Sequence, residues 1–343
     1  MDWNNFIVVG ENIHCTRVVK RDGAKTAVLP DGRIGVSFKH GGADRMLPVP
    51  PTWAQFSPAF NEGKIKHVAL AIHQALNAGG DDRQAGLDYL CYLAERQIKA
   101  GAAYLDVNVD EYSADAGQAA EVMSFVARFL SDRYSTPLSI DSSNLNILRA
   151  GLAACRTDNR PPMINSISLE RVEAVELATE FNASAIVNAT GRSGMPSGVE
   201  DRLKNFREIV NILENAGVAR GKLHLDPLVF PISTDPLNGA HFLQSTAAAT
   251  AEFAGVHLSG GLSNVSFGMP NRGLLNIVFA WLCVEVGTDG GIIDPVTMPV
   301  SAMAELDTDS EQFRLAKAVL IGEDLYGAEY ISAFREGRLG KGA

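Results

Sequence analysis

The stretch AAYLDVNV, residues 102–109, alternates apolar and polar side chains as a β-strand with two different faces does. Leu105 and Val107 fall on one face, whereas Asp106 and Asn108 fall on the other. Turning that polar face toward an apolar helix layer would carry a desolvation penalty for every unpaired group. The strand therefore predicts a sheet that is packed along most of its length and polar where the strand ends.

The rest of the chain repeats this arrangement, with helix-like segments between strand-like ones. Glycines at 101 and 217 are placed to end two of the helices. The other expected strands cover 6–12, 137–143, 163–168, 183–190, 222–229, 256–264 and 290–296. Helices are expected at about 85–100, up to about 133, over a short segment between the fourth and fifth strands, across 203–213, and at about 239–253, 272–286 and 310–325.

Eight successive strand-then-helix units predict an α/β fold, a (β/α)8 TIM barrel formed by one domain that spans residues 1–343. An open, doubly wound sheet is the alternative, but no GxGxxG motif follows the first strand. The segment 16–64 is longer than a usual βα loop and is read as an insertion, with a hairpin turning at 30–32 and a proline-rich lid or arm after it. Residues 339–343 are expected to form a disordered tail.

Composition narrows the class of protein. A net charge of −10 argues against a nucleic-acid binder. The four cysteines are scattered without a CxxC pair, which is typical of reduced thiols in a cytoplasmic enzyme. The N-terminus lacks the pattern of a signal peptide, and no stretch approaches the ~20 apolar residues of a membrane span. We expect a soluble, cytoplasmic protein that does not bind membranes or nucleic acid.

Polar residues recur where the expected strands end, and in a barrel these ends face one mouth. Each of them could instead cap a helix or shape a turn, but agreement across the strands favours a ligand site. The residues are Glu11, Asn12, Asp106, Asn108, Asp141, Asn165, Asn188, Asp226, Asn264 and Asp294.

This ring is rich in carboxylates and amides and poor in lysine, histidine and cysteine. Carboxylates and amides read the edge of a flat heterocycle that carries N–H donors and a carbonyl. A transition metal would prefer clustered histidine and cysteine; His14 and His224 each lack such a cluster in the sequence, so no bound metal is expected. Asp141 and Asp226, with Asn165, would suit a pterin.

Several of these strand ends also lie in motifs of a known family. Together they resemble the pterin-binding barrels of methyltetrahydrofolate–corrinoid methyltransferases, which include the folate domain of cobalamin-dependent methionine synthase. The resemblance covers about 6–13 and 81–325. The motifs are GENI (10–13), YLDVNVDE (104–111), PLSIDSSN (137–144), LRAGL (148–152), MINSIS (163–168), HLDPL (224–228) and GLSNVSFGMPNR (261–272).

The resemblance implies methyl transfer between N5 of tetrahydrofolate and the cobalt of a corrinoid. It implies that the pterin is bound by Asp141, Asn165 and Asp226, in a pocket that Asp106, Asn108, Asn188 and Glu11 also line. Asn264 corresponds to the residue near N5, and an amide there can both accept and donate a hydrogen bond. Arg272 is a candidate for the p-aminobenzoyl or glutamate tail by resemblance, and Arg192 is one on charge alone. Gly260 and Gly261 are expected to leave room for the pterin and the corrinoid.

No cobalamin-binding DxHxxG motif occurs, so the corrinoid is expected on a separate, transiently bound protein. The favoured direction is from methylcorrinoid to tetrahydrofolate in a one-carbon catabolic, demethylating pathway, and relatives suggest a homodimer. The alternatives are an enzyme like dihydropteroate synthase, which would carry a late basic SxR motif that is absent here, and a folate-binding subunit without catalysis.

The chain departs from the family pattern in its first motif. The family has arginine after Gly-Glu, whereas Asn12 follows Glu11 here, with His14 two residues later. The contact that the arginine makes in the family is therefore not carried over to this chain. The insertion at 16–64 is the second departure, and it is expected to lie over the mouth, where it either closes over folate or shapes the docking of a partner.

Overall fold

The computed structural model describes residues 3–156 and 160–340. The chain divides into two compact units. Unit 1 comprises Met1–Gly10, Ala100–Ala103 and Pro161–Ala343, and unit 2 comprises Glu11–Lys99 and Tyr104–Arg160. The first strand, β1 (Ile7–His14), runs from one unit into the other. The single domain predicted for 1–343 stays a prediction.

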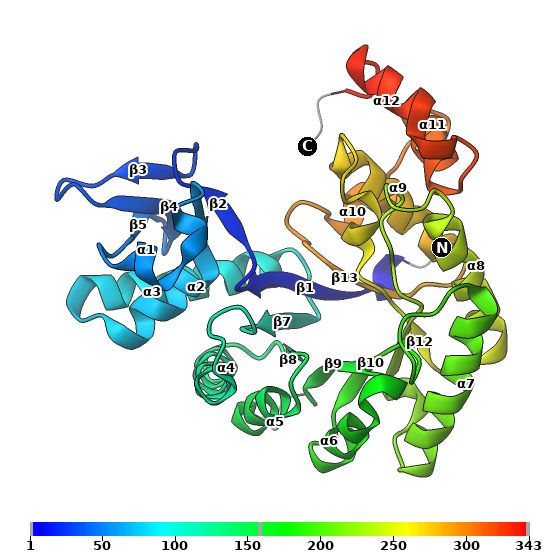
Figure 1. Cartoon of the computed structure of the whole chain (residues 1–343), viewed down its shortest axis with the longest axis horizontal. Helices are drawn as coiled ribbons and strands as arrows, with labels where there is room; N and C mark the ends of the chain where they lie inside the picture. The colour runs from blue at the N-terminus through cyan, green and yellow to red at the C-terminus, as the bar shows by residue number, and fades with distance from the viewer. Residues whose placement is uncertain (1–2, 157–159, 341–343) are drawn as a thin grey trace. The chain divides into compact units, whose positions relative to one another are not determined.

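Unit 1 is built on parallel strands whose ends carry the predicted polar residues. Four of them pair in chain order, and a fifth, β13, pairs in parallel with the start of β1 (Figure 1). The strands are β9 (Met163–Ile167), β10 (Ser184–Asn188), β11 (Leu223–Asp226), β12 (His257–Leu258) and β13 (Gly290–Ile293).

Among the helices of unit 1, α7 buries the apolar stripe that the spacing predicts. In α7 the buried residues include Leu203, Phe206, Val210 and Leu213, and Gly217 follows the helix with a φ of 88°. The helices are α6 (Val175–Glu180), α7 (Val199–Asn215), α8 (Asn238–Glu252), α9 (Arg272–Glu285), α10 (Val300–Ala304), α11 (Glu311–Leu320) and α12 (Ala328–Arg335).

Unit 2 holds two further parallel strands, β7 (Tyr104–Asn108) and β8 (Leu138–Asp141), in a register that puts Asn108 opposite Asp141. Helices α4 (Ala116–Ser131) and α5 (Leu145–Ala154) pack against each other and against these strands (Figure 1). The register follows from burial, because a slip by one residue would turn Leu105 and Val107 away from the core.

The insertion forms a small structure of its own within unit 2. The hairpin predicted at 30–32 is confirmed, with Gly32 at a φ of 83°. The proline-rich part is packed, since the Trp53 side chain is fully buried. The elements are β2 (Val18–Lys20), β3 (Thr26–Val28), β4 (Ile34–His40), β5 (Ala43–Pro48), α1 (Trp53–Phe56) and β6 (Lys64–Lys66), followed by α2 (His67–Asn77) and α3 (Gly80–Lys99).

The eight parallel strands belong to one sheet, with helices between successive strands, as predicted for a (β/α)8 TIM barrel. One expectation is too long: the strand expected at 256–264 is only His257–Leu258 and gives way to the 3-10 turn η5 (Leu262–Ser266). Helices α2, α5 and α12 are not among those that the periodicity predicts.

At the C-terminus the predicted disordered tail needs a correction at its first residue. Leu339 is buried, and its carbonyl accepts a hydrogen bond from Asn271; residues 341–343 lie outside the described part of the chain. No helix in the described ranges is long and apolar enough to cross a membrane.

Close packing of α2 on α3 requires a glycine at position 86. A Cβ built there would lie 2.5 Å from the Ala71 carbonyl oxygen and 2.7 Å from the Ala75 nitrogen. We predict that Gly86→Ala lowers the free energy of unfolding by about 1–3 kcal/mol because backbone atoms must separate. Gly79→Ala is the control, since its Cβ meets nothing within 4 Å. Equal urea midpoints for the two variants would contradict this packing argument.

Candidate functional site

Asn188, at the end of β10, is held by hydrogen bonds to neighbours in unit 1. Its Nδ2 donates to Ser166 Oγ at 2.7 Å, and its Oδ1 accepts from the Thr190 amide at 3.1 Å. Strand register places it directly beside Asp226 at the end of β11. The register of β9 on β10 pairs Asn165 with Ile186, two residues before Asn188. The structure thus brings three predicted strand-end residues of unit 1 to adjacent positions.

The carboxylate of Asp226 is buried, with only 8% of the residue exposed. Burial raises its pKa to about 6, although a hydrogen bond from the Leu228 amide at 2.8 Å and the charge of Arg202 both oppose the shift. The group is therefore ionised at neutral pH but takes up a proton under mildly acidic conditions.

Arg202 is a residue that sequence reasoning missed. It lies on α7, is 1% exposed, and donates from Nε to the Pro227 carbonyl at 2.6 Å. Its Nη1 is buried and has no hydrogen-bond partner within 3–156 and 160–340. The signal was present in the sequence, because Arg202 precedes Phe206 and Ile209 by one and two helical turns and so shares their apolar face.

Asn264 lies in the turn that replaces the end of the expected strand. Its side chain is exposed and has no hydrogen-bond partner among the described residues, while its backbone is fixed at both ends. Its amide donates to the Gly261 carbonyl, and its carbonyl accepts from the Phe267 amide, both at 3.1 Å. The backbone of Asn264 is therefore held in place, and its side-chain amide is available to a ligand.

The two glycines before this turn first serve the protein itself. A Cβ at Gly260 would lie 3.2 Å from Asp226 Oδ1 and 3.0 Å from two atoms of the Phe242 ring. A Cβ at Gly261 would lie 2.9 Å from Asn264 Nδ2. Gly260 thus makes room for the Asp226 carboxylate and Gly261 for the Asn264 amide, while the access for pterin and corrinoid that the sequence predicts stays a prediction.

The two arginines proposed for the folate tail have partners within unit 1. Arg272 donates from Nε to Ser266 Oγ at 3.0 Å and from Nη2 to the Ser263 carbonyl at 2.9 Å, so it braces the turn that holds Asn264. Arg192 forms an exposed ion pair with Glu208 at 2.7 Å. Their assignment to the tail stays a prediction.

In unit 2, His14 lies between two predicted site residues. Its Nε2 is 3.1 Å from Asp106 Oδ2 and 2.9 Å from Asp141 Oδ2. Burial opposes a charge on the imidazole, but hydrogen bonds to the two carboxylates outweigh it and raise the pKa of His14 to about 10. At neutral pH this cluster thus holds an imidazolium.

The same cluster supplies the counter-charge that two adjacent carboxylates need. Burial and the charge of Asp106 raise the pKa of Asp141, and His14 opposes that rise, as does the Asn108 Nδ2 donor at 3.1 Å. The sequence showed no partner for His14. Within the described ranges, the ligand atoms of His14, Asp106 and Asp141 form the one group close enough to hold a cation, all lying within 4.8 Å of one another.

Glu11, another predicted pterin-lining residue, forms an ion pair with Arg17 Nη2 at 2.8 Å. The insertion and the end of β6 also reach the loop after β7, where Lys66 is 2.7 Å from Glu111 and the ring of Phe56 lies 5.1 Å from that of Tyr112. A cavity of about 330 Å³ lies at this contact. Within unit 2 the insertion therefore packs against the loop that follows β7, and its predicted place over the mouth stays a prediction.

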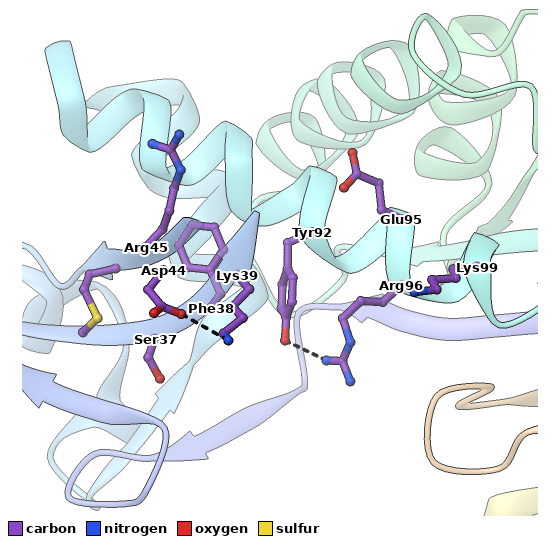
Figure 2. Close-up of a pocket in the computed structure, with 10 residues that line it drawn as sticks. Ser37, Phe38, Lys39, Asp44, Arg45, Tyr92, Glu95, Arg96 and Lys99 are labelled. Atoms are coloured by element: carbon purple, nitrogen blue, oxygen red, sulfur yellow. Dashed lines mark hydrogen bonds and ion pairs between the residues drawn. The ribbon is translucent and has the colours of Figure 1, made fainter. Parts of the chain in front are cut away.

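A wider groove of about 740 Å³ lies between β4, β5 and α3, also in unit 2 (Figure 2). Phe38, Met46 and Tyr92 contribute apolar surface, and Arg96 donates to the Tyr92 hydroxyl at 2.8 Å. Its lining contains none of the predicted site residues. The groove is thus a feature of the insertion and α3, separate from the strand-end residues.

Comparison with known proteins agrees with a pterin-related site. Residues 76–294 match the model of the pterin binding enzyme family. The chain belongs to this family. The resemblance stated from the motifs is confirmed, and the insertion at 16–64 lies outside the matched residues.

Among curated relatives, a methylcorrinoid:tetrahydrofolate methyltransferase of Eubacterium limosum is 28% identical over 253 residues, which cover 71% of this chain and 86% of that protein. Among solved structures, dihydropteroate synthase of Xanthomonas albilineans in complex with 7,8-dihydropteroate has a TM-score of 0.54 and 17% identity, covering 89% of this chain and 94% of that one. A Yersinia pestis dihydropteroate synthase with a pterine-sulfa conjugate has a TM-score of 0.52 and 20% identity, covering 64% and 86%. These structures show the shared fold alone.

Replacing His14 by glutamine should make stability less dependent on pH. The folded-state pKa of about 10 exceeds the ordinary value of 6.5, so the stabilisation is complete below about pH 6.5 and is lost as pH rises toward 10. We predict that His14→Gln lowers the free energy of unfolding by about 2 kcal/mol near pH 6.5, less than the loss of a fully buried ion pair. Urea unfolding across pH 6.5–9.5 should show the two proteins converging; a constant difference would contradict the charged state.

The neighbouring glycines give a matched pair of variants with different expected defects. Gly260→Ala presses on an aromatic ring and a buried carboxylate, so we predict a loss of about 1–3 kcal/mol in the free energy of unfolding. Gly261→Ala meets the end of an exposed side chain, so stability should change by less than about 0.5 kcal/mol while folate-dependent activity falls. Thermal unfolding and activity assays separate the two. Equal stability losses would show that Gly261 packs against more than the Asn264 amide.

Proposed function

We propose that this protein is a methyltransferase that moves a methyl group from the cobalt of a corrinoid, carried on a separate protein, to N5 of tetrahydrofolate. The observation that carries the proposal is the free side-chain amide of Asn264, three residues after Gly261 and close to the Gly260 that accommodates Asp226, in a member of the pterin binding enzyme family. Similarity to a methylcorrinoid:tetrahydrofolate methyltransferase supports both substrates and the direction.

In this proposal the carboxylates and amides at the strand ends recognise the pterin. A pterin presents N–H donors at its amino-pyrimidinone edge, and an ionised carboxylate accepts from them. Asp226 meets that need above about pH 6, where it is charged. The remaining residues proposed for the pterin are Asn165 and Asn188 in unit 1, and Asp141, Asp106, Asn108 and Glu11 in unit 2.

Asn264 is proposed to serve the reacting nitrogen. In transfer to folate, the N5 lone pair forms the new N–C bond, the electron pair of the Co–C bond stays on cobalt as cobalt(I), and N5 loses its proton. The Asn264 carbonyl oxygen can accept from N5–H and so aim the lone pair at the methyl group, which is an orienting effect. In the reverse direction the same oxygen can stabilise a protonated N5, which turns the amine into a better leaving group.

The remaining parts of the proposal follow from the same chemistry. The corrinoid protein binds transiently, the enzyme binds no metal directly, and the reaction belongs to a one-carbon catabolic, demethylating pathway. We further propose a cytoplasmic homodimer. Copurification of a corrinoid-containing protein with this chain would identify the partner.

The test is visible absorbance. Protein, tetrahydrofolate and methylcobalamin together should convert the methylcobalamin spectrum to that of cobalt(I) cobalamin under anaerobic conditions, and methyltetrahydrofolate with cobalt(I) cobalamin should do the opposite. Folate binding with no conversion in either direction would instead favour a non-catalytic folate-binding subunit. Condensation of p-aminobenzoate with a pterin pyrophosphate would favour an enzyme like dihydropteroate synthase.

Asn264→Ala should lower turnover more than about tenfold, because the transition state loses its contact to N5. Its side chain is exposed, so folding and tetrahydrofolate affinity should stay close to those of the wild type. Asn264→Asp keeps an acceptor and loses the donor, so activity above that of the alanine variant would assign the effect to the oxygen. An unchanged kcat in Asn264→Ala would reject the role.

A further inference from the structure

Phe267 stands out because 63% of the residue is exposed while the two residues before it are buried. Its amide donates to the carbonyl of Asn264 at 3.1 Å, and its own carbonyl accepts from Ser233 Oγ at 2.6 Å. The Arg272 guanidinium lies 5.6 Å from the ring centroid. The backbone of Phe267 is thus anchored on both sides, and its ring faces solvent beside the proposed reaction centre.

Three other large apolar side chains are exposed on neighbouring segments of unit 1. Leu237 is 44% exposed, and Leu325 and Tyr326 are 56% and 75% exposed. A Cβ at Gly322 would lie 2.8 Å from Leu237 Cδ2, and one at Gly327 would lie 2.9 Å from Met269 Cε. The segment that carries Leu325 and Tyr326 therefore lies against Leu237 and against Met269, which follows Phe267 by two residues. We call Leu237, Phe267, Leu325 and Tyr326 the rim patch.

A cluster of exposed apolar side chains on adjoining loops marks an interaction surface more often than single exposed residues do. The described chain exposes nine large apolar residues, and four of them form the rim patch. All four belong to unit 1, which also contains Asn264. One member of the patch, Phe267, is therefore joined by a backbone hydrogen bond to Asn264, the residue proposed to act on N5.

We propose that the rim patch receives the corrin ring of the methyl-carrying partner, with Phe267 as its main contact. This inference rests on the proposed function. Methyl transfer requires the reacting atoms to approach to about 3–3.5 Å, so the corrin must come close to Asn264. A corrin is a broad, nearly flat macrocycle, which therefore also covers the residues next to Asn264. An exposed aromatic ring offers it a rigid apolar contact without a large loss of side-chain freedom.

The p-aminobenzoyl ring of folate is the competing occupant of Phe267, because it is also flat and apolar. The two occupants predict different losses in one variant. A corrin contact makes Phe267→Ala weaken corrinoid binding and leave folate binding unchanged. A folate contact makes the same variant weaken folate binding and leave corrinoid binding unchanged.

The experiment measures equilibrium binding of free methylcobalamin and of tetrahydrofolate separately, without turnover. For Phe267→Ala we expect the Kd for methylcobalamin to rise about five- to tenfold. Phe267→Leu should show a smaller rise, since it keeps apolar area and loses the flat ring. Tyr326→Asn, in which asparagine tolerates the φ of 58°, should weaken methylcobalamin binding by a smaller factor and checks the patch independently of the Asn264 turn. Val28→Ala, which trims a residue 74% exposed on the inserted hairpin, is the control.

Steady-state kinetics then separate this inference from the proposed function. Phe267→Ala should raise KM for methylcobalamin and leave kcat within about twofold, the signature of lost uniform binding. An unchanged Kd for methylcobalamin in Phe267→Ala, an equal loss in Val28→Ala, or a loss confined to tetrahydrofolate would overturn the corrin contact. If methylcobalamin binds in a Phe267-dependent way and no methyl group moves, the proposed reaction fails and the corrin contact stands.

Discussion

A carboxylate buried at the end of an apolar strand is the constraint around which the site of unit 1 is arranged. Asp226 can remain charged there because a backbone amide bonds it and the charge of Arg202 lies nearby. The next strand end must then lack a side chain, since a Cβ at Gly260 would crowd that carboxylate. Once Gly260 is fixed, the chain turns early, and Asn264 is held in a 3-10 turn in place of a strand.

Unit 2 meets the same electrostatic requirement with a different cation. Asp106 and Asp141 both lie within about 3 Å of one imidazole nitrogen, and two carboxylates so close would otherwise share a proton. The protonated His14 removes that conflict. The family arginine after Gly-Glu is replaced by Asn12 here, and the only cation on β1 is His14. Arg17 of the insertion instead pairs with Glu11. In this chain the charges around the first motif are therefore paired locally, His14 with the two aspartates and Glu11 with Arg17.

The sequence predicted the strands well because alternation depends on burial, which acts on each strand separately. It missed η5 because Gly260 and Gly261 were interpreted as room for the pterin and the corrinoid within a longer strand, whereas Gly260 lies against Asp226 and Gly261 against Asn264. His14 had no visible partners because Asp106 and Asp141 lie 92 and 127 residues away. Arg202 was passed over because an arginine in an amphipathic helix is usually on the surface. Apart from the contact of Gly261 with Asn264, these misses come from contacts between residues distant in sequence.

The difference between Asn264 and the other strand-end groups argues for chemistry at that residue. Asn108, Asn188 and Asp226 each make a hydrogen bond within their own unit, which fixes them before any ligand arrives. Fixed acceptors suit a ring whose hydrogen-bonding edge does not change during a reaction. The Asn264 amide has no such bond among the described residues. A side chain stabilises an atom whose charge changes most strongly when no internal hydrogen-bond partner competes for that side chain. The free side-chain amide of Asn264 is therefore the group suited to N5.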